Sequence, residues 1–331
     1  MYDIVTIGSA TRDAFLRSRG IKVIPTRAFP IGKAQAVPLG GKVTVDDLVF
    51  ETGGAGTNTA VAFARLGFRT AFLGKLGAFD PGGREVVRQL EAEGVTTKLV
   101  RRDRQHVTAY SIVLLTSKGE RTVLVYRGAA GHLHPREIPA TRVARWFYLS
   151  ALGGDLPLLR RVFSVARQHR IRLAWNPGSD ELAHGQQRLR PFLNQAGIVF
   201  LNEEETSQLT GVPLSQPGAA FRKLCAWTSA IVVVTAGNRG AVACDDRHHY
   251  AVIPSRVKAK NRTGAGDAFG SGFVAGWLRR PGDIRFALQV GTANAESVIQ
   301  TFGAKRGLLR RIPRSSRLSR IRTVPNRERY G

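Results

Sequence analysis

The run Asn-Arg-Thr-Gly-Ala-Gly-Asp-Ala-Phe at 261–269 has the composition of a phosphate-binding turn followed by a helix. Its small residues Gly264, Ala265 and Gly266 let backbone N–H groups point outward at a helix N-terminus, where the helix dipole favours negative charge. Asp267 would lie in the first helical turn and could accept a proton from a hydroxyl group. A phosphate cradle beside such a base could move a phosphoryl group onto an alcohol. Gly-rich turns with an Asp also begin many helices that bind nothing, so the rest of the chain must decide.

Two further polar turns follow predicted strands in the second half of the chain. The first begins a helix with Asn202 and includes Glu205, whose carboxylate could either complement the helix dipole or hold Mg²⁺ through water. The second contains Thr235, Gly237 and Gly240, where glycine lets the backbone approach a phosphate and the threonine offers a hydroxyl. Ligands of open α/β sheets bind at the carboxyl ends of the strands, so we expect these turns to meet at one edge.

Three positions near the N-terminus could bind the hydroxyl groups of a small ligand. Asp13 lies just past the predicted strand 3–8, where it could also be a simple turn residue. Gly54 and Asn58 belong to a Gly-rich turn that runs into a helix of small apolar residues. Bare backbone and an amide side chain can hydrogen-bond a polar ligand. A tightly packed helix start without a ligand would have the same composition.

The order of predicted elements indicates an α/β fold. Short apolar strands at 172–175, 198–201 and 230–235 are separated by helical stretches, and this alternation is typical of a parallel sheet with helices on both faces. Residues 20–51 interrupt this alternation of strands and helices. They are predicted to form a small β region outside the main sheet, with extended pieces near 42–51. Residues 108–126 read as a β-hairpin around a Ser-Lys-Gly-Glu turn. We expect the segments of about 14–51 and 106–127 to form a lid.

Taken together, these motifs resemble the ribokinase-like carbohydrate kinases, the PfkB family, over residues 1–310. The most diagnostic motif is the Thr-Gly-Ala-Gly-Asp run at 263–267. The others are the Gly-rich turn at 53–58 with Gly67 and Gly77, the N-x-x-E of 202–205, and the T-x-G-x-x-G of 235–240.

The resemblance implies a Rossmann-like three-layer α/β/α core with a small β-sheet lid. It also implies in-line transfer of phosphate from ATP to a hydroxymethyl group, with Asp267 as general base and Gly264, Ala265 and Gly266 stabilising the charge that develops. A small sugar is the first expected acceptor. A nucleoside such as adenosine is the second, and a non-catalytic binder of nucleotide or nucleic acid is the alternative outside this class.

The resemblance also assigns roles to the remaining motif residues. Glu205 and Asn202 would order Mg²⁺ and its waters, and Asn202 would also lie near the nucleotide. The expected substrate contacts are Asp13, Gly54 and Asn58, and the expected ATP contacts are Thr235, Gly237 and Gly240.

Two residues depart from the family pattern. Many members have an aspartate where this chain has Asn261, and that aspartate helps to bind a monovalent cation, so K⁺ is implied only weakly. Arg262 replaces a small residue, and we expect its side chain to point into solvent.

Composition limits the partners more than it does the fold. The 331 residues carry a formal charge of +26, which suggests weak polyanion binding, and the Arg-rich tail 311–331 is expected to be mobile. No apolar run has bilayer length and the N-terminus lacks the basic start of a signal peptide, so no membrane role is expected. The two cysteines, Cys225 and Cys244, suggest neither a disulfide nor a zinc site, in keeping with a cytoplasmic location. Family resemblance also suggests a homodimer formed through the lid.

Overall fold

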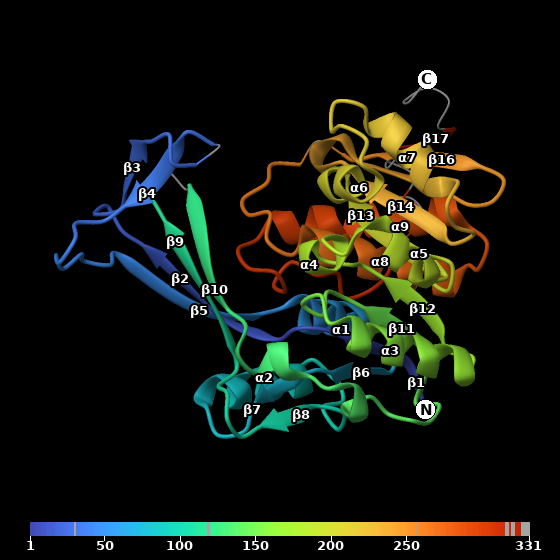
Figure 1. Cartoon of the computed structure of the whole chain (residues 1–331), viewed down its shortest axis with the longest axis horizontal. Helices are drawn as coiled ribbons and strands as arrows, with labels where there is room; N and C mark the ends of the chain where they lie inside the picture. The colour runs from blue at the N-terminus through green and yellow to red at the C-terminus, as the bar shows by residue number, and fades with distance from the viewer. Residues whose placement is uncertain (30, 118–119, 256, 315–317, 319–321, 326–331) are drawn as a thin grey trace.

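Figure 1 shows the computed structural model of the chain, in which a large sheet surrounded by helices lies beside a smaller sheet that projects from it. The structure describes all residues except 30, 118–119, 256, 315–317, 319–321 and 326–331. The strands are β1 Tyr2–Ile7, β2 Thr11–Arg17, β3 Lys22–Pro25, β4 Lys33–Ala36, β5 Asp47–Gly53, β6 Thr70–Leu73, β7 Lys75–Gly77, β8 Arg101–Asp103, β9 Ala109–Leu115, β10 Arg121–Tyr126, β11 Ala144–Leu149, β12 Arg172–Trp175, β13 Ile198–Asn202, β14 Ile231–Thr235, β15 Ala241–Cys244, β16 His249–Ile253 and β17 Arg322–Pro325. The helices are α1 Ala55–Arg65, α2 Pro81–Ala92, α3 Leu156–Gln168, α4 Ser179–Leu182, α5 Gly185–Leu193, α6 Glu203–Thr210, α7 Pro217–Cys225, α8 Ala265–Arg279 and α9 Ile284–Ile299, with the 3₁₀ turns η1 Gly128–His132, η2 Pro135–Glu137 and η3 Gly237–Arg239.

The large sheet has nine strands in the order β17-β16-β15-β14-β13-β12-β11-β1-β6. The six strands from β6 to β14 pair in parallel, and β15, β16 and β17 are added antiparallel at one edge. Parallel strands require a crossover between neighbours, and helices supply it here. The alternation in the sequence therefore predicted this part of the fold correctly.

Apolar side chains of the large sheet point alternately to two cores. On β11, Phe147 and Leu149 pack with α3, α5 and α7, whereas Trp146 and Tyr148 face α1, α8 and α9. The sheet is thus covered by helices on both faces, and the predicted three-layer α/β/α architecture is confirmed. None of the helices in the described part of the chain has the length and apolar character needed to cross a membrane.

Helices α8 and α9 pack so closely that their backbones nearly touch. A Cβ added at Gly272 would lie 2.9 Å from the Cα of Gly291, and one added at Gly276 would lie 2.9 Å from the Cα of Ala287. Real Cβ atoms do not approach other atoms this closely, so glycine is required at these two positions. This contact fixes the axis of α8, the helix that begins at the Gly264–Asp267 motif.

The smaller sheet has four strands in the order β10-β9-β2-β5, and β3 and β4 form a separate hairpin beyond it. Antiparallel pairing of β9 with β10 confirms the hairpin predicted at 108–126. Strand β2 pairs with both β5 and β9 and so joins the two predicted lid segments in one sheet. Large apolar side chains remain exposed on this sheet, among them Leu48 (53%), Phe50 (48%) and Val125 (65%).

Some elements differ from their prediction. Asp13 does not lie in a loop: it belongs to β2, because residues 11–17 continue directly from β1 into the smaller sheet. Residues 42–45, predicted to be extended, form no strand. The described part of the Arg-rich tail takes part in the fold, since β17 pairs with β16 and Leu318 is buried. The rest of the tail lies outside the described residues.

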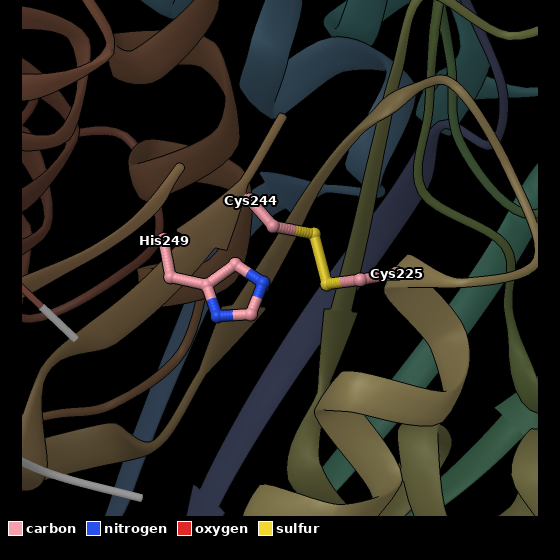
Figure 2. A group of neighbouring side chains, drawn as sticks. All are labelled: Cys225, Cys244 and His249. Atoms are coloured by element: carbon pink, nitrogen blue, oxygen red, sulfur yellow. A yellow bond between two sulfur atoms is a disulfide. The ribbon is translucent and has the colours of Figure 1, made fainter. Parts of the chain in front are cut away.

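The prediction that the two cysteines form no disulfide was wrong. Cys225, at the end of α7, is bonded to Cys244, at the end of β15, and Figure 2 shows the bond with His249 beside it. A separation of 19 residues gave no hint of this pairing, which arises because α7 packs over the end of β15. The sulfur atoms and a ring nitrogen of His249 lie within 4.8 Å of one another, but sulfurs bonded to each other are not thiolate ligands for a metal.

Candidate active site

The N-terminus of α8 has the geometry of an anion cradle. Gly264 adopts the left-handed conformation with φ 76° and directly precedes the helix. Among the described residues, the N–H groups of Gly266 and Asp267 have no acceptor, as is usual in a first helical turn. A Cβ added at Gly266 would meet no atom within 4 Å, so the space in front of these N–H groups is open. The sequence placed this turn correctly at a helix start.

Asp267 is held by a residue more than two hundred positions earlier in the chain. The Asn58 side-chain amide donates to Asp267 Oδ2 over 2.8 Å, which joins the first turns of α1 and α8. The Asn58 side chain is 5% exposed, and its Oδ1 has no hydrogen-bond partner among the described residues. Buried acceptors are normally satisfied, so this oxygen is available to a donor from a ligand. The structure thus brings together two of the predicted site residues.

Burial raises the pKa of Asp267, and the Asn58 hydrogen bond and the nearby charge of Lys305 oppose this effect. The Tyr148 hydroxyl lies beneath this site, and burial together with the Asp267 charge raises the pKa of Tyr148. A carboxyl group with a raised pKa beside open space is a frequent property of proton-transfer sites. The arrangement can therefore accept a proton from a hydroxyl placed above Asp267.

Lys305 belongs to the site, although the sequence did not reveal it. Its Nζ donates to the backbone oxygen of Thr52 over 2.6 Å and to Thr52 Oγ1 over 3.0 Å. Burial lowers the pKa of Lys305 to about 8, although the carboxylates of Asp13 and Asp267, with those of Glu51 and Glu93, act in the opposite direction. The chain has 50 lysines and arginines, and nothing in the local sequence distinguishes Lys305 from the others. Only the fold brings it beside these acids.

The 302–306 segment, which contains Lys305, connects the smaller sheet to the cradle. A Cβ added at Gly264 would lie 2.6 Å from the Cβ of Ala304, so this segment lies against the cradle. The Phe302 ring packs edge-on against Phe15 with centroids 4.9 Å apart, and Arg306 forms an ion pair of 2.5 Å with Glu51. Residues of β2 and β5 are thereby held next to Asp267.

The predicted substrate residues Asp13 and Gly54 lie on this side of the molecule too. Asp13 is 9% exposed and accepts a hydrogen bond of 2.7 Å from Thr11 Oγ1. Gly54 has φ 90° and precedes α1, and a Cβ there would lie 2.6 Å from the backbone oxygen of Ser9. Glycine is therefore needed for the chain to turn from β5 into α1. We call Asp13, Gly54, Asn58, Gly264–Asp267 and Lys305 the α8 group.

A second cluster lies at the carboxyl ends of neighbouring strands. Asn202 ends β13 and pairs in register with Thr235, which ends β14. Gly237 begins the turn η3, and Gly240 adopts φ 98° directly after it. Arg239 of this turn forms an ion pair with Glu203, which links the two strand ends. We call Asn202, Glu205, Thr235, Gly237 and Gly240 the strand-end group.

Asn202 and Glu205 form a reciprocal helix cap. Glu205 N–H donates to Asn202 Oδ1 over 2.7 Å, and Asn202 N–H donates to Glu205 Oε2 over 2.8 Å. Burial raises the pKa of Glu205, although the Asn202 bond lowers it and Glu204 adds to the rise. The cap occupies Oε2 of Glu205 and leaves Oε1, so the residue fits a contact to a metal-bound water rather than a two-oxygen metal contact.

The cradle loop leaves little support for a monovalent cation. Asn261 carries no charge, and its Oδ1 accepts a hydrogen bond of 2.8 Å from the Thr263 N–H, so one of the two lone pairs of this oxygen is used within its own turn. Thr263 Oγ1 in turn accepts from Arg121 of β10 over 2.9 Å, a contact between the smaller sheet and the cradle. The Arg262 side chain is exposed, as expected.

The two clusters have different partners. Among the described residues, no hydrogen bond or ion pair joins Asp267 to the strand-end group. The α8 group offers a carboxylate, a free amide oxygen and open N–H groups, which suits a hydroxylated ligand together with an anion. The strand-end group offers backbone and a hydroxyl at the carboxyl edge of the sheet, where open α/β folds bind their ligands.

Several known proteins resemble this chain in sequence. Residues 1–310 match the model of the pfkB family of carbohydrate kinases. A fructokinase of Escherichia coli is 32% identical over 241 residues, and the match covers 68% of this chain and 76% of that protein.

Solved structures support the fold. A nucleoside kinase of Methanocaldococcus jannaschii, described as an archaeal member of the ribokinase family, superimposes with a TM-score of 0.77 at 18% identity over 97% of this chain and 99% of its own. An Arabidopsis thaliana ribokinase complexed with ribose and ATP superimposes with a TM-score of 0.73 at 20% identity over 93% and 96%.

Proposed function

Because the chain belongs to the pfkB family of carbohydrate kinases, we propose that it transfers phosphate from ATP to a hydroxymethyl group of a small sugar, with Asp267 as general base. Family membership makes it an ATP-dependent kinase of sugars or nucleosides. The observation that carries the finer proposal is the Asn58–Asp267 bond beside an open helix N-terminus.

Asp267 would take the proton of the substrate hydroxyl at Oδ1. The Asn58 amide holds Oδ2, which fixes the orientation of the carboxylate and leaves the other oxygen to the substrate. The free oxygen of Asn58 would accept a second substrate hydroxyl, and Asp13 and the backbone at Gly54 would bind others. These contacts would place the reacting oxygen beside the cradle, which is the main requirement for transfer.

The N–H groups of Gly266 and Asp267 would stabilise the negative charge of the transferring phosphoryl group, with Gly264 and Ala265 shaping the turn. Thr235, Gly237, Gly240 and Asn202 would lie along the phosphates of ATP. Mg²⁺ bound with ATP would neutralise phosphate charge, and Glu205 would hold it through a water molecule. The smaller sheet would act as a lid that excludes water, and its contacts from Arg121 and Glu51 to the cradle region support this role.

Lys305 would keep Asp267 ionised. A carboxyl group whose pKa is raised by burial is a poor base at low pH, and a neighbouring cation lowers that pKa. Lys305 is held in place by Thr52 of β5, so this assistance would depend on the position of the lid strand. We assign Lys305 a positioning and electrostatic role, not direct contact with the reacting atoms.

The acceptor is proposed to be a sugar because the side chains of the α8 group are polar and the relative with 32% identity is named a fructokinase. A screen of sugars, nucleosides and their monophosphates with a coupled ADP assay tests this, run with and without Mg²⁺ and K⁺. Turnover of a free sugar that requires Mg²⁺ is the expected result. Turnover of nucleosides alone would overturn the sugar assignment, and dependence on K⁺ would contradict the account of Asn261.

We also propose that a second copy of the chain covers the smaller sheet. On the face of the sheet opposite Asp13, exposed apolar side chains of β5, β9 and β10 leave a patch that a monomer would expose to water, including Leu48, Phe50, Ile112 and Leu124. Light scattering should find a dimer for the wild type and a monomer for Leu124→Lys. Leu214→Lys, at an exposed apolar residue outside the sheet, should remain dimeric. A monomeric wild type would overturn this proposal.

A further inference from the structure

A small cavity lies outside both clusters, at the base of the smaller sheet. Its volume is about 260 Å³, the space of about nine water molecules at roughly 30 Å³ each. Its lining consists mainly of basic and histidine side chains. The residues are Lys75, Arg102, Asp103, Arg104, Gln105, His106, His132, His134 and Arg136, and we call them the hinge cavity.

The acids at this cavity already have hydrogen-bond or ion-pair partners. Asp103, its one lining carboxylate, accepts hydrogen bonds from the N–H groups of Gln105 and His106 and lies 3.9 Å from Lys75 Nζ. Although burial acts in the opposite direction, these bonds and the His106 ring lower the pKa of Asp103 to about 2. Glu137, just behind the lining, pairs with Lys75 over 3.2 Å.

The three arginines of the lining have no such acid. Arg102, Arg104 and Arg136 are exposed, and in the described part of the chain no carboxylate lies within 4.0 Å of their guanidinium groups. Guanidinium groups that converge on one cavity without counter-ions form a strong site for oxyanions, because each can donate two parallel hydrogen bonds.

Two histidine rings complete the wall. The rings of His106 and His132 are stacked with centroids 3.8 Å apart and planes 11° apart. Nδ1 of His106 lies 3.2 Å from Asp103 Oδ2, which anchors one ring of the pair. Ring N–H groups at the edge of this pair can donate hydrogen bonds to an oxyanion. His134 lines the same wall and adds a third imidazole.

The cavity lies where the chain enters the smaller sheet at β9 and leaves it after β10. His106 comes three residues before β9, and His132 ends η1 shortly after β10. The segment before β9 and the segment after β10, which we call the two crossings, are hydrogen-bonded to each other, since the Ala129 N–H donates to the Val107 oxygen over 2.9 Å. In Figure 1, β9 and β10 run down to this level, near β7 and β8. A ligand here would contact both crossings and not the proposed active site.

We propose that the hinge cavity binds a small phosphate-bearing dianion through Arg104, Arg136 and the stacked histidines. The shared chemistry is a phosphate group, which inorganic pyrophosphate and sugar phosphates both supply. Binding does not involve Asp267, the cradle or the strand-end group, so it is independent of the phosphoryl transfer proposed above.

Histidine NMR on the full-length protein tests this directly, because the chain has only seven histidines. The ring signals of His106, His132 and His134 are assigned by single His→Asn variants. Pyrophosphate and, separately, glucose 6-phosphate are then titrated with the nucleotide site saturated by a non-hydrolysable ATP analogue. We expect saturable shifts of these three signals with at least one of the two probes. The probe that binds more tightly identifies the source of the phosphate.

A matched pair of variants locates the site. Arg104→Ala/Arg136→Ala removes two charge-assisted contacts and should weaken binding at least about tenfold. Arg160→Ala/Arg167→Ala removes the same charge from another arginine-lined cavity, between α3 and α5, and should bind as the wild type does. The proposal is overturned if neither probe shifts the three signals, or if both double variants weaken binding equally. Equal weakening would mean only a general response to net charge.

Discussion

The α8 group and the strand-end group are built in opposite ways. In the α8 group the decisive contacts join distant segments: Asn58 to Asp267 are 209 residues apart, and Thr52 to Lys305 are 253 apart. In the strand-end group they span shorter separations, from three residues in the Asn202–Glu205 cap to 36 in the Glu203–Arg239 ion pair. The α8 group therefore depends on the whole fold, whereas the strand-end group depends on two strand–helix turns.

This difference predicts different consequences of mutation. A change in the α8 group should alter the chemical step and its pH dependence. A change in the strand-end group should alter local stability and nucleotide affinity while leaving the pH dependence as it is. Four substitutions test this contrast, in decreasing order of expected effect.

Asp267→Asn should give the largest effect. It removes the proposed proton acceptor but keeps the shape of the side chain, and loss of a general base lowers rates about 10²–10⁴-fold. The expected result is that loss in kcat, with ATP affinity by calorimetry unchanged. Asp246→Asn, at an exposed acid of the β15–β16 turn, is the matched control and should be fully active. A similar loss of ATP affinity in Asp267→Asn would show that Asp267 serves binding instead.

Asn58→Leu should lower kcat/KM for the acceptor about 10- to 100-fold. The substitution removes the donor to Asp267 Oδ2 and the free acceptor oxygen, and hydrogen bonds to charged groups contribute about 1.5–3 kcal/mol. Steady-state kinetics with the sugar found by the screen measure it. The free energy of unfolding, measured in parallel by urea denaturation, separates a site effect from misfolding. A kcat/KM within twofold of wild type would remove Asn58 from the mechanism.

Lys305→Met should shift the pH profile more than it lowers the maximal rate. Lys305 lowers the pKa of Asp267, so its removal raises that pKa, and the acid limb of the kcat profile moves to higher pH. Turnover is thus lost mainly at low pH and recovers as pH rises. Lys260→Met, at an exposed lysine close to the cradle in the sequence, should leave the limb in place. An unmoved limb in Lys305→Met would contradict the role of Lys305.

Asn202→Ala should have the smallest effect and a different kind of effect. It removes the side-chain cap of α6 and should lower the free energy of unfolding by about 0.5–2 kcal/mol in urea denaturation. The acid limb of the kcat–pH profile should stay at the same pH as in the wild type. Asn194→Ala, at the exposed residue that follows α5 and whose side chain makes no hydrogen bond among the described residues, should leave stability unchanged. A shifted acid limb in Asn202→Ala would break the distinction between the two groups.

The same contrast explains what the sequence could predict. The turns around Asn202, Thr235 and Gly264 follow from local chemistry, because glycine, asparagine and a strand-to-helix change mark them within a few residues. The three-layer core and the hairpin at 108–126 follow from local periodicity for the same reason. Family resemblance, not periodicity, supplied the roles of Asp13 and Asn58.

Features that depend on distant packing were missed or misplaced. Lys305 gains its place from contacts with β5 and the cradle, and no local pattern encodes them. Asp13 was assigned to a loop because nothing in the sequence shows that β2 continues from β1 into a second sheet. The two cysteines were expected to be unpaired, and a reducing compartment was inferred from this. Because Cys225 and Cys244 form a disulfide, the cysteines no longer support that inference.

The most direct test of the central claim is the pH dependence of a single turnover, measured side by side for the wild type and Asp267→Asn. Burial raises the pKa of Asp267 above its ordinary value of 3.8, and only the ionised carboxylate can accept a proton. The account predicts a wild-type rate that rises with pH through an apparent pKa above 3.8, and a slow rate without that limb in Asp267→Asn. The same limb in both proteins would show that another group is the base.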